Sequence, residues 1–355
     1  MSKLSICIVS PGLSGGGAED IAIKSANFYF KKNYRVVFIT FQKQGVLKNR
    51  LIPGIKIIYV KMKNILSFSF DKRIKKYEFS HTISFIRHCN IATFLARKFG
   101  NLKTKKLHLI EVNTFDQQAE LNFFKRLFQN ILLKITYSFS EDVIAVSNLV
   151  KNQIIKKFNI SNNLRVVGNP CISLKSINEI KKKQKQNRYT KYVSAGRLHP
   201  QKDFLFMLRV FRDLKEMQKF NLDTLTIYGT GPEYKKIKKF IKKYKLSKFV
   251  FMKGFVDNLD QKLKKYDAFV LSSKYEGFGN VIIMAMNAGL PVIAKKNTGG
   301  PDDLINHKNG KLFINEIQLL NIFKKFKNFK FQTSAAKEIA KRYTEDIICM
   351  KYLKI

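Results

Sequence analysis

Short apolar runs alternate with segments of helical periodicity along nearly the whole chain, and this alternation most constrains the fold. In the first half the runs lie at residues 4–10, 35–40, 55–60, 82–86, 107–112 and 143–146, with helices expected at 18–32 and 120–138. In the second half they lie at 192–195, 225–228, 250–252, 269–271 and 292–294, with helices expected at 203–217, 232–244, 259–265 and 280–288. Strands that alternate with helices form parallel sheets covered on both faces. We therefore expect an α/β protein with doubly wound parallel sheets.

A length of 355 residues exceeds what one hydrophobic core ordinarily supports and suits two domains of about 170 residues each. We expect the N-terminal domain at residues 1–170, followed by a polar, basic linker at 171–191. The C-terminal domain is expected at residues 192–332, and residues 333–355 are expected to form a helix that packs back on the first domain. The predicted architecture is two Rossmann-like domains that face an interdomain cleft.

Composition restricts the class of protein further. A chain with 45% hydrophobic and 26% charged residues is typical of globular proteins, and no run of about 18 apolar residues is present to span a bilayer. The N-terminal segment is too short and strand-like for a signal peptide, so a cytoplasmic location is expected. The widely spaced cysteines, Cys7, Cys89, Cys171 and Cys349, are expected to be reduced core thiols. No metal is expected, because the chain has no Asp-x-Asp pair and its five histidines are scattered.

The chain carries 67 Lys and Arg against 25 Asp and Glu, a net charge of +42. Such a charge attracts polyanions, namely nucleic acid, an anionic membrane face or phosphorylated substrates. A lysine-rich composition alone produces the same excess, because the lysines are spread along the whole chain. Nucleic acid is not favoured, since no RNA-binding aromatic signature or helix-turn-helix glycine turn accompanies the charge. The lysine-rich helix at 234–244 is expected to face the core with Ile237 and Ile241, with contact to an anionic membrane as the alternative.

Three consecutive glycines, residues 15–17, stand between the first strand and the first helix, where backbone amides are able to approach a phosphate or a sugar. The turn does not match a dinucleotide fingerprint, because Asp20 holds the place of the third glycine. It does not match a P-loop either, since Ala18 and Glu19 stand where Lys and Ser or Thr are required. The alternative is a tight turn with no ligand.

Two further turns carry charged side chains at the carboxyl ends of expected strands. Arg197 and Lys202 flank the turn after the strand at 192–195, so two cations and helix amides converge on one point, as holding a diphosphate requires. Glu276 is the one carboxylate in the turn after the strand at 269–271. A carboxylate there accepts hydrogen bonds from sugar hydroxyls or polarises a leaving group. The simpler alternatives are a helix cap and solvated surface charges.

These residues resemble retaining, nucleotide-sugar-dependent glycosyltransferases of family 4, which have the GT-B architecture. The similarity extends over nearly the whole chain, through residues 15–19, 83–85, 145–147, 168–170, 196–202, 228–232, 276–279, 288–292 and 299–301. The resemblance implies a UDP-sugar donor and a lipid-linked, lipopolysaccharide or capsule saccharide acceptor bound by the first domain. It also implies that the positive surface faces lipid-linked intermediates, through peripheral contact with the inner face of the cytoplasmic membrane.

The resemblance implies roles for individual residues. Arg197 and Lys202 would bind the donor diphosphate and, together with Glu276, form the catalytic group. The donor would be held by a larger set that adds Gly16, Gly17, Gly229, Phe255, Val256, Gly277, Phe278, Gly279, Asn280 and Met284. No cofactor is implied, because the nucleotide-sugar is itself a substrate.

Two positions depart from the family pattern. Relatives carry a second carboxylate, separated by seven intervening residues from the one that corresponds to Glu276, and it binds the ribose hydroxyls. Met284 stands at that place here. Methionine accepts no comparable hydrogen bond, and we expect the loss to weaken donor affinity by about 1.5 to 3 kcal/mol, or about 10- to 100-fold. Many relatives also carry a histidine directly after a position like that of Glu111, where this chain has Val112. A diphosphate leaving group that acts as the base makes a protein nucleophile unnecessary, so turnover does not require that histidine.

Three functions are therefore compatible with the sequence. The first is an active retaining glycosyltransferase that moves a hexose or N-acetylhexosamine from a UDP-sugar. The second is a degenerate transferase scaffold that binds a partner or glycan with weak or no turnover. The third is a polyanion-binding protein, with nucleic acid as the polyanion, whose charge is the function.

Overall fold

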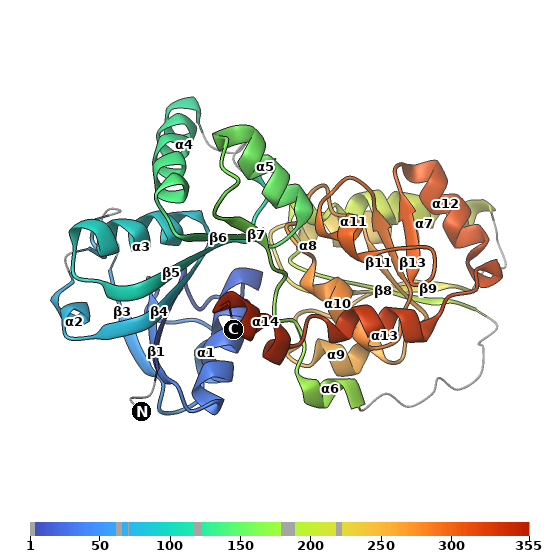
Figure 1. Cartoon of the computed structure of the whole chain (residues 1–355). Helices are drawn as coiled ribbons and strands as arrows, with labels where there is room; N and C mark the ends of the chain where they lie inside the picture. Colours follow the sequence, from blue (N-terminus) through green and yellow to red (C-terminus); the bar gives the residue numbers. More distant parts are fainter. Residues whose placement is uncertain are drawn as a thin grey trace. The chain divides into compact units, whose positions relative to one another are not determined.

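The computed structural model describes residues 4–61, 66–69, 71–116, 122–178, 189–217 and 222–354. The chain divides into two compact units: unit 1 combines Met1–Pro170 with Thr344–Ile355, and unit 2 comprises Cys171–Tyr343. Each unit contains one parallel β-sheet with helices packed on both of its faces (Figure 1). The predicted α/β class with two doubly wound sheets is therefore confirmed.

Unit 1 has a seven-stranded sheet in the order β3-β2-β1-β4-β5-β6-β7. Its strands are β1 (Ser5–Ser10), β2 (Arg35–Thr40), β3 (Lys56–Tyr59), β4 (Glu78–Phe85), β5 (Lys103–Glu111), β6 (Asp142–Ala145) and β7 (Leu164–Val166). Its helices are α1 (Gly17–Lys31), α2 (Lys72–Lys75), α3 (Arg87–Phe99), α4 (Phe123–Ser138), α5 (Asn148–Phe158) and α14 (Glu345–Tyr352). In the central strand β1, residues 6–9 are fully buried, as a parallel strand covered on both faces requires.

Unit 2 has a six-stranded sheet in the order β10-β9-β8-β11-β12-β13. Its strands are β8 (Lys191–Ala195), β9 (Thr224–Tyr228), β10 (Val250–Met252), β11 (Ala268–Leu271), β12 (Val292–Lys295) and β13 (Gly310–Phe313). Its helices are α6 (Leu174–Asn178), α7 (Phe204–Met217), α8 (Tyr234–Lys243), α9 (Leu259–Leu263), α10 (Asn280–Asn287), α11 (Gly300–Leu304), α12 (Glu316–Lys324) and α13 (Thr333–Lys341). The strand order reverses between β8 and β11, and such a reversal is where doubly wound sheets bind ligands.

Several elements differ from the sequence-based expectation. Helices α3 and α5 and the edge strands β7 and β13 were not predicted, because short or mixed apolar runs leave little periodicity to read. Within the stretch predicted as a linker, residues 174–178 form α6, and residues 179–188 lie outside the described part of the chain. The segment 333–355 is not one helix: α13 packs against α10 in unit 2, whereas α14 packs against α1 in unit 1. The break has a local cause, because the Thr344 side chain caps a new helix by accepting a hydrogen bond from the amide of Ile347.

The apolar side of the lysine-rich helix α8 is buried. Ile237 and Ile241 belong to the core of unit 2, where they pack among the residues of α7 and β9. The helix therefore has the core-facing arrangement expected for it, with its lysines on the solvent side. None of the four cysteines forms a disulfide, and all four are buried.

A buried chain of polar contacts crosses unit 1 and ends at the C-terminal segment. His81 Nδ1 lies 2.9 Å from His108 Nε2, and His108 Nδ1 lies 2.6 Å from Asp142 Oδ2. Arg165 Nε donates to Asp142 Oδ1 at 2.7 Å, and the same guanidinium donates to the carbonyl oxygens of Lys351 and Tyr352 at the end of α14. Burial and the hydrogen bond from Arg165 act in opposite directions on the pKa of Asp142, which is lowered overall. Strands β4 to β7 and α14 are thus held together by one charged network.

This network predicts that the stability of unit 1 depends on pH. Burial and the neighbouring His108 and Lys106 lower the pKa of His81 from 6.5 to about 4. Between those two values the unfolded chain binds a proton that the folded chain does not, so the free energy of unfolding falls as the pH falls. At about pH 5 the expected loss is about 2 kcal/mol relative to neutral pH. Denaturant titrations at both pH values should show a smaller loss in His81→Gln, whereas the exposed-histidine control His307→Gln should behave as the wild type. Equal losses in all three proteins would contradict the assignment.

Candidate functional site

The candidate site lies at the carboxyl ends of β8 and β11, which are neighbours in the sheet of unit 2. The turn that follows β8 is hydrogen-bonded to the turn that follows β11. The amide of Lys274 donates to the carbonyl of Gln201 at 2.8 Å, and Gln201 Nε2 donates to the carbonyl of Tyr275 at 2.9 Å. The hydroxyl of Ser272 donates to the carbonyl of Lys202 at 2.9 Å. The two turns therefore form one surface.

Lys202 and Glu276 form an ion pair across these turns. The Lys202 ammonium donates to Glu276 Oε2 at 2.5 Å, and the hydroxyl of Ser273 donates to the same oxygen at 3.0 Å. The two side chains are only 14% and 12% exposed, so solvent weakens the pair less than it would a surface pair. The other carboxylate oxygen, Oε1, accepts no hydrogen bond from any residue in the described ranges. The sequence predicted both residues for this site, and the structure brings them into contact.

The backbone around Glu276 is fixed by the segment that precedes α11. The Glu276 amide donates to the carbonyl of Thr298 at 2.7 Å, and the amide of Gly300 donates to the carbonyl of Glu276 at 3.2 Å. The Asp302 carboxylate in turn accepts hydrogen bonds from the amides of residues 297, 298 and 299. A Cβ atom on Gly300 would lie 1.7 Å from the carbonyl oxygen of Phe278, so the close approach of these backbones requires glycine. Sequence reasoning did not assign a role to Asp302.

The N-terminus of α10 lies directly after this turn. Gly279 is the N-cap, with φ of 89°, and no side chain caps the helix. The first amides of a helix without a side-chain cap suit an anionic or hydroxylated ligand, because they have no partner within the helix. Phe278 is buried, and its ring lies 4.9 Å from the ring of Tyr343. The predicted residues Gly277, Phe278, Gly279 and Asn280 thus continue the surface that begins at Glu276.

Arg197 follows β8 on an exposed position, with Gly196 before it. It forms no ion pair with any residue in the described part of the chain. The guanidinium is therefore available to a diphosphate beside Lys202, which is the role that the sequence predicted.

The remaining predicted residues of unit 2 lie along the same edge. Gly229 follows β9, and its amide donates to the carbonyl of Gly254 at 2.7 Å. Phe255 and Val256 follow Gly254 after β10, with Phe255 52% exposed and Val256 half-buried. An exposed aromatic ring at this edge provides a stacking surface for a planar base.

Met284 lies on α10, one helical turn after Asn280, and is half-buried. Its side chain brings no charge to the part of the surface where the family pattern has a second carboxylate. The position is on the predicted helix, so the departure concerns the chemistry of the side chain and not its location.

Gly16 and Gly17 belong to unit 1, where their turn has an internal ligand. The carboxylate of Glu19 accepts hydrogen bonds from the amides of Gly15 and Gly16 at 2.7 and 2.6 Å and from the hydroxyl of Ser14 at 3.0 Å. In unit 1 as described, two of the amides expected to approach a phosphate or sugar are thus already bonded to Glu19. A glutamate three residues after the N-cap supplies one half of a capping box, the half that bonds to the N-cap amide, and this signal was available in the sequence.

Unit 1 carries a second polar cluster that sequence reasoning missed. Glu111, at the end of β5, is fully buried and accepts hydrogen bonds from Arg87 Nε at 2.8 Å and from the Tyr137 hydroxyl at 2.9 Å. Burial and the Glu111 charge raise the pKa of Tyr137. Val112, the residue at the place of the family histidine, is buried beside this cluster. The sequence signal that could have revealed this cluster is the position of Arg87 and Glu111, two charged residues at the ends of successive apolar runs.

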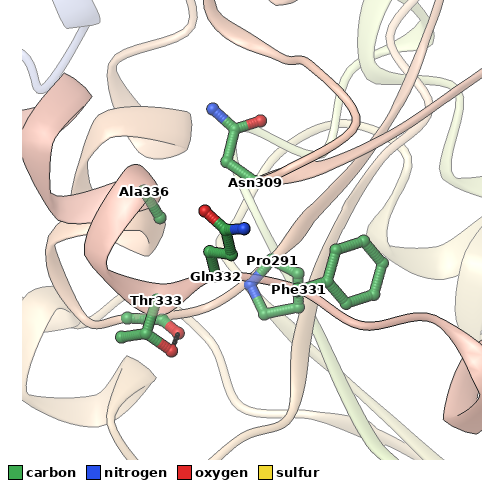
Figure 2. A pocket seen from close by; sticks show the side chains of 7 residues that line it. Pro291, Asn309, Phe331, Gln332, Thr333 and Ala336 are labelled. Carbon is green, nitrogen blue, oxygen red and sulfur yellow. Dashed lines mark hydrogen bonds between the residues drawn. The ribbon is translucent and has the colours of Figure 1, made fainter.

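A small pocket elsewhere in unit 2 is separate from the candidate site. Figure 2 shows the residues that line it, including Pro291, Asn309, Gln332 and Thr333. Pro291 and Asn309 directly precede β12 and β13, so the pocket lies at the amino ends of the strands, the opposite edge of the sheet from Glu276. Within the described ranges no group of three or more His, Cys, Asp and Glu side chains is arranged to hold a metal ion.

Comparison with known proteins defines the class. Residues 176–343, almost the whole of unit 2, match the family model of glycosyl transferases group 1. The solved structure of the lipopolysaccharide outer core galactosyltransferase WaaB superposes with a TM-score of 0.74 at 19% identity, over 99% of this chain and 98% of WaaB. HepE from Anabaena, solved in complex with UDP, superposes with a TM-score of 0.77 at 18% identity, over 99% and 98% of the two chains. These likenesses establish the GT-B fold, a fold of sugar-transferring enzymes.

Sequence relatives agree with the fold. A Campylobacter jejuni N-acetylgalactosaminyltransferase, which acts on a saccharide linked to diphospho-undecaprenol, is 24% identical over 86% of this chain and 83% of its own length. The amylovoran biosynthesis glycosyltransferase AmsD of Erwinia amylovora is 28% identical over 61% of this chain and 62% of its own length. Through unit 2 the chain belongs to the glycosyltransferase group 1 family, and it is a glycosyltransferase with the GT-B fold. The family resemblance and the enzyme class predicted from the sequence are confirmed.

Proposed function

We propose that this enzyme is a retaining transferase that moves a hexose or N-acetylhexosamine from a UDP-sugar to a saccharide acceptor of surface-polysaccharide biosynthesis. The observation that carries the proposal is the Lys202 and Glu276 pair at the reversal point of the sheet. Arg197, which is exposed and forms no ion pair with any described residue, lies in the same turn as Lys202. Relatives named for transfer to a lipid-linked saccharide and for amylovoran biosynthesis support a lipid-linked or polysaccharide acceptor. UDP bound to the structurally similar HepE supports the nucleotide.

The proposed reaction needs no protein nucleophile. The bond between the sugar C1 and the phosphate oxygen breaks, and the acceptor oxygen bonds to C1 from the same face. The acceptor hydroxyl transfers its proton to the departing phosphate oxygen. Arg197 and Lys202 stabilise the negative charge that develops on the diphosphate, and Glu276 Oε1 accepts a hydrogen bond from a sugar hydroxyl. Val112 in place of a histidine is compatible with this path.

The test is UDP release by the purified full-length chain. It is incubated with a panel of UDP-hexoses and UDP-N-acetylhexosamines, with and without undecaprenyl-diphosphate-linked saccharides. We expect one donor to release UDP faster with an acceptor, and the anomeric configuration of the product should match that of the donor. UDP binding without release for any donor and acceptor would favour the degenerate scaffold. Absence of UDP binding, together with salt-sensitive RNA binding, would favour the polyanion-binding alternative.

Met284→Glu tests whether the donor site is complete. A carboxylate at this position should hydrogen-bond the ribose hydroxyls and tighten UDP binding by about 10- to 100-fold. Isothermal titration calorimetry with UDP measures the change, and Met284→Leu, which keeps an apolar side chain of similar size, is the matched control. Turnover that appears only in Met284→Glu would favour a degenerate scaffold. An unchanged affinity would show that the ribose is bound elsewhere.

The membrane contact that the sequence allows is also part of the proposal. The proposed acceptors are carried by lipids, so the enzyme is expected to work at the inner face of the cytoplasmic membrane. Within the described ranges, no helix is long and apolar enough to cross a membrane. A peripheral contact would therefore use the surface of the protein.

A further inference from the structure

Helix α4 of unit 1 exposes an unusually large apolar surface. Phe124 is 78% exposed and Phe128 is 62% exposed. The other large apolar side chains that are exposed on α4 and at its C-cap are Phe123, Leu127, Ile131, Ile135 and Phe139. Seven such residues on one helix exceed the scattered apolar residues that a protein surface ordinarily carries.

The apolar residues form one stripe because of their spacing. At 3.6 residues per turn, positions 124, 128, 131 and 135 lie above one another on one side of the helix. The opposite side is the one that packs on unit 1, through the buried side chains of Leu133, Thr136 and Tyr137. Tyr137 is further held by its hydrogen bond to Glu111. The stripe therefore points away from the core, and α4 is anchored in this orientation.

The surroundings of the stripe are positively charged. Helices α4 and α5, which stand together on one face of the sheet of unit 1 (Figure 1), contain no Asp or Glu. They contribute six cations, Lys125, Arg126, Lys134, Lys151, Lys156 and Lys157. Burial and the nearby Arg87 and Arg126 lower the pKa of Lys157, as expected where cations crowd together. Of the carboxylates close in sequence, Asp116 accepts a hydrogen bond from Gln153, Glu141 is paired with Arg97, and Glu120 lies outside the described residues.

We propose that α4 binds the surface of an anionic lipid bilayer, with its phenylalanine stripe at the boundary of headgroups and acyl chains. Lys125 and Lys134, which are exposed and flank the stripe on α4, would lie against the lipid phosphates. A second copy of the chain is disfavoured as the occupant, because it would bring together two surfaces of the same positive charge. The lysine-rich helix α8 is not the membrane helix, since its apolar side is buried. This role of α4 rests on the membrane contact in the proposed function, but the experiment that tests it measures lipid binding and not turnover.

The chain has no tryptophan, so a single introduced tryptophan reports on one position. Phe124→Trp and Phe128→Trp are compared with Ile317→Trp, which replaces a 70% exposed residue of α12 in unit 2. Vesicles of phosphatidylcholine with phosphatidylglycerol should shift the emission of the two α4 variants to the blue, and brominated acyl chains should quench it. The Ile317→Trp emission should not change. Pure phosphatidylcholine should give a weaker shift, and high salt should reduce the shift on anionic vesicles.

Introducing negative charges on the stripe gives an independent test. Phe124→Glu/Phe128→Glu should weaken co-sedimentation with anionic vesicles by about 10- to 100-fold. Ile314→Glu/Ile317→Glu adds the same two charges to exposed positions of unit 2 and should bind vesicles like the wild type. Thermal unfolding and UDP affinity should be the same in both variants, which separates this result from failure to fold and from failure of the proposed transferase function. Unshifted emission from both α4 tryptophans would overturn the proposal. So would a wild-type dimer that does not bind vesicles and that Phe124→Glu/Phe128→Glu splits, because α4 would then be an interface between copies.

Discussion

Replacing Glu276 by Gln is expected to lower kcat/KM for sugar transfer by about 100- to 1,000-fold. The variant keeps the shape of the side chain but loses the negative charge that holds the Lys202 ammonium at 2.5 Å. It also exchanges a charged acceptor for a neutral amide where Glu276 Oε1 would meet a sugar hydroxyl. The Lys202 ammonium would no longer be oriented toward the leaving diphosphate. UDP release under steady-state conditions measures the loss.

Two comparisons make this result specific. UDP affinity should change far less than kcat/KM, because Glu276 is proposed to contact the sugar and not the nucleotide. Ser273→Ala removes only the neutral hydrogen bond to Glu276 Oε2 and should cost much less activity than Glu276→Gln. If Glu276→Gln transferred sugar at the wild-type rate, the carboxylate would have to be reassigned as a structural partner of Lys202.

Gly229→Ala is expected to lower the free energy of unfolding by about 3 to 4 kcal/mol. Gly229 has φ of 137°, a conformation that side chains rarely adopt, and a Cβ atom there would lie 1.9 Å from the carbonyl oxygen of Gly196. Relief of this clash must move either the end of β8 or the end of β9. Either shift changes the position of the turn that carries Arg197, so UDP affinity should fall together with stability.

Gly254→Ala is the matched control for this prediction. Gly254 also has a positive φ, of 68°, but a Cβ atom there would have no neighbour within 4 Å. Its expected cost is therefore only the backbone strain of about 1 kcal/mol. Denaturant titrations of the two variants separate the clash from the strain. Equal losses would mean that the contact between Gly229 and Gly196 is relieved without cost.

The sequence predicted the strands and the site turns of unit 2 better than the helices of unit 1. The runs at 192–195, 225–228, 250–252, 269–271 and 292–294 correspond to β8 to β12 because buried parallel strands are continuous apolar runs bounded by turn residues. Helix α3 begins with Arg87 and contains the polar residue Asn90. Both are buried, and their polar groups are hydrogen-bonded to β5 or the turn after it. Local periodicity cannot reveal a buried polar residue whose partners are distant in sequence.

The residues of the candidate site were predicted from the sequence, but their contacts were not. Arg197, Lys202 and Glu276 were assigned from their places after strands, since the carboxyl ends of parallel strands share one edge of the sheet. The contact between Lys202 and Glu276, 74 positions apart, depends on the pairing of β8 with β11. The occupation of the Gly15 and Gly16 amides by Glu19 was missed, although it is local, because the turn was compared only with phosphate-binding patterns.

The sequence by itself determined the fold class, the enzyme family and the edge of the sheet where the charged residues gather. Those features depend on local periodicity and on motifs that are short in sequence. Only the tertiary structure decided that Lys202 is paired with Glu276, whereas Arg197 pairs with no residue that the structure describes. It also decided that the apolar residues of α4 face outward and those of α8 face inward. Two amphipathic helices look alike in sequence, because periodicity shows that a helix has an apolar side but not what that side packs against.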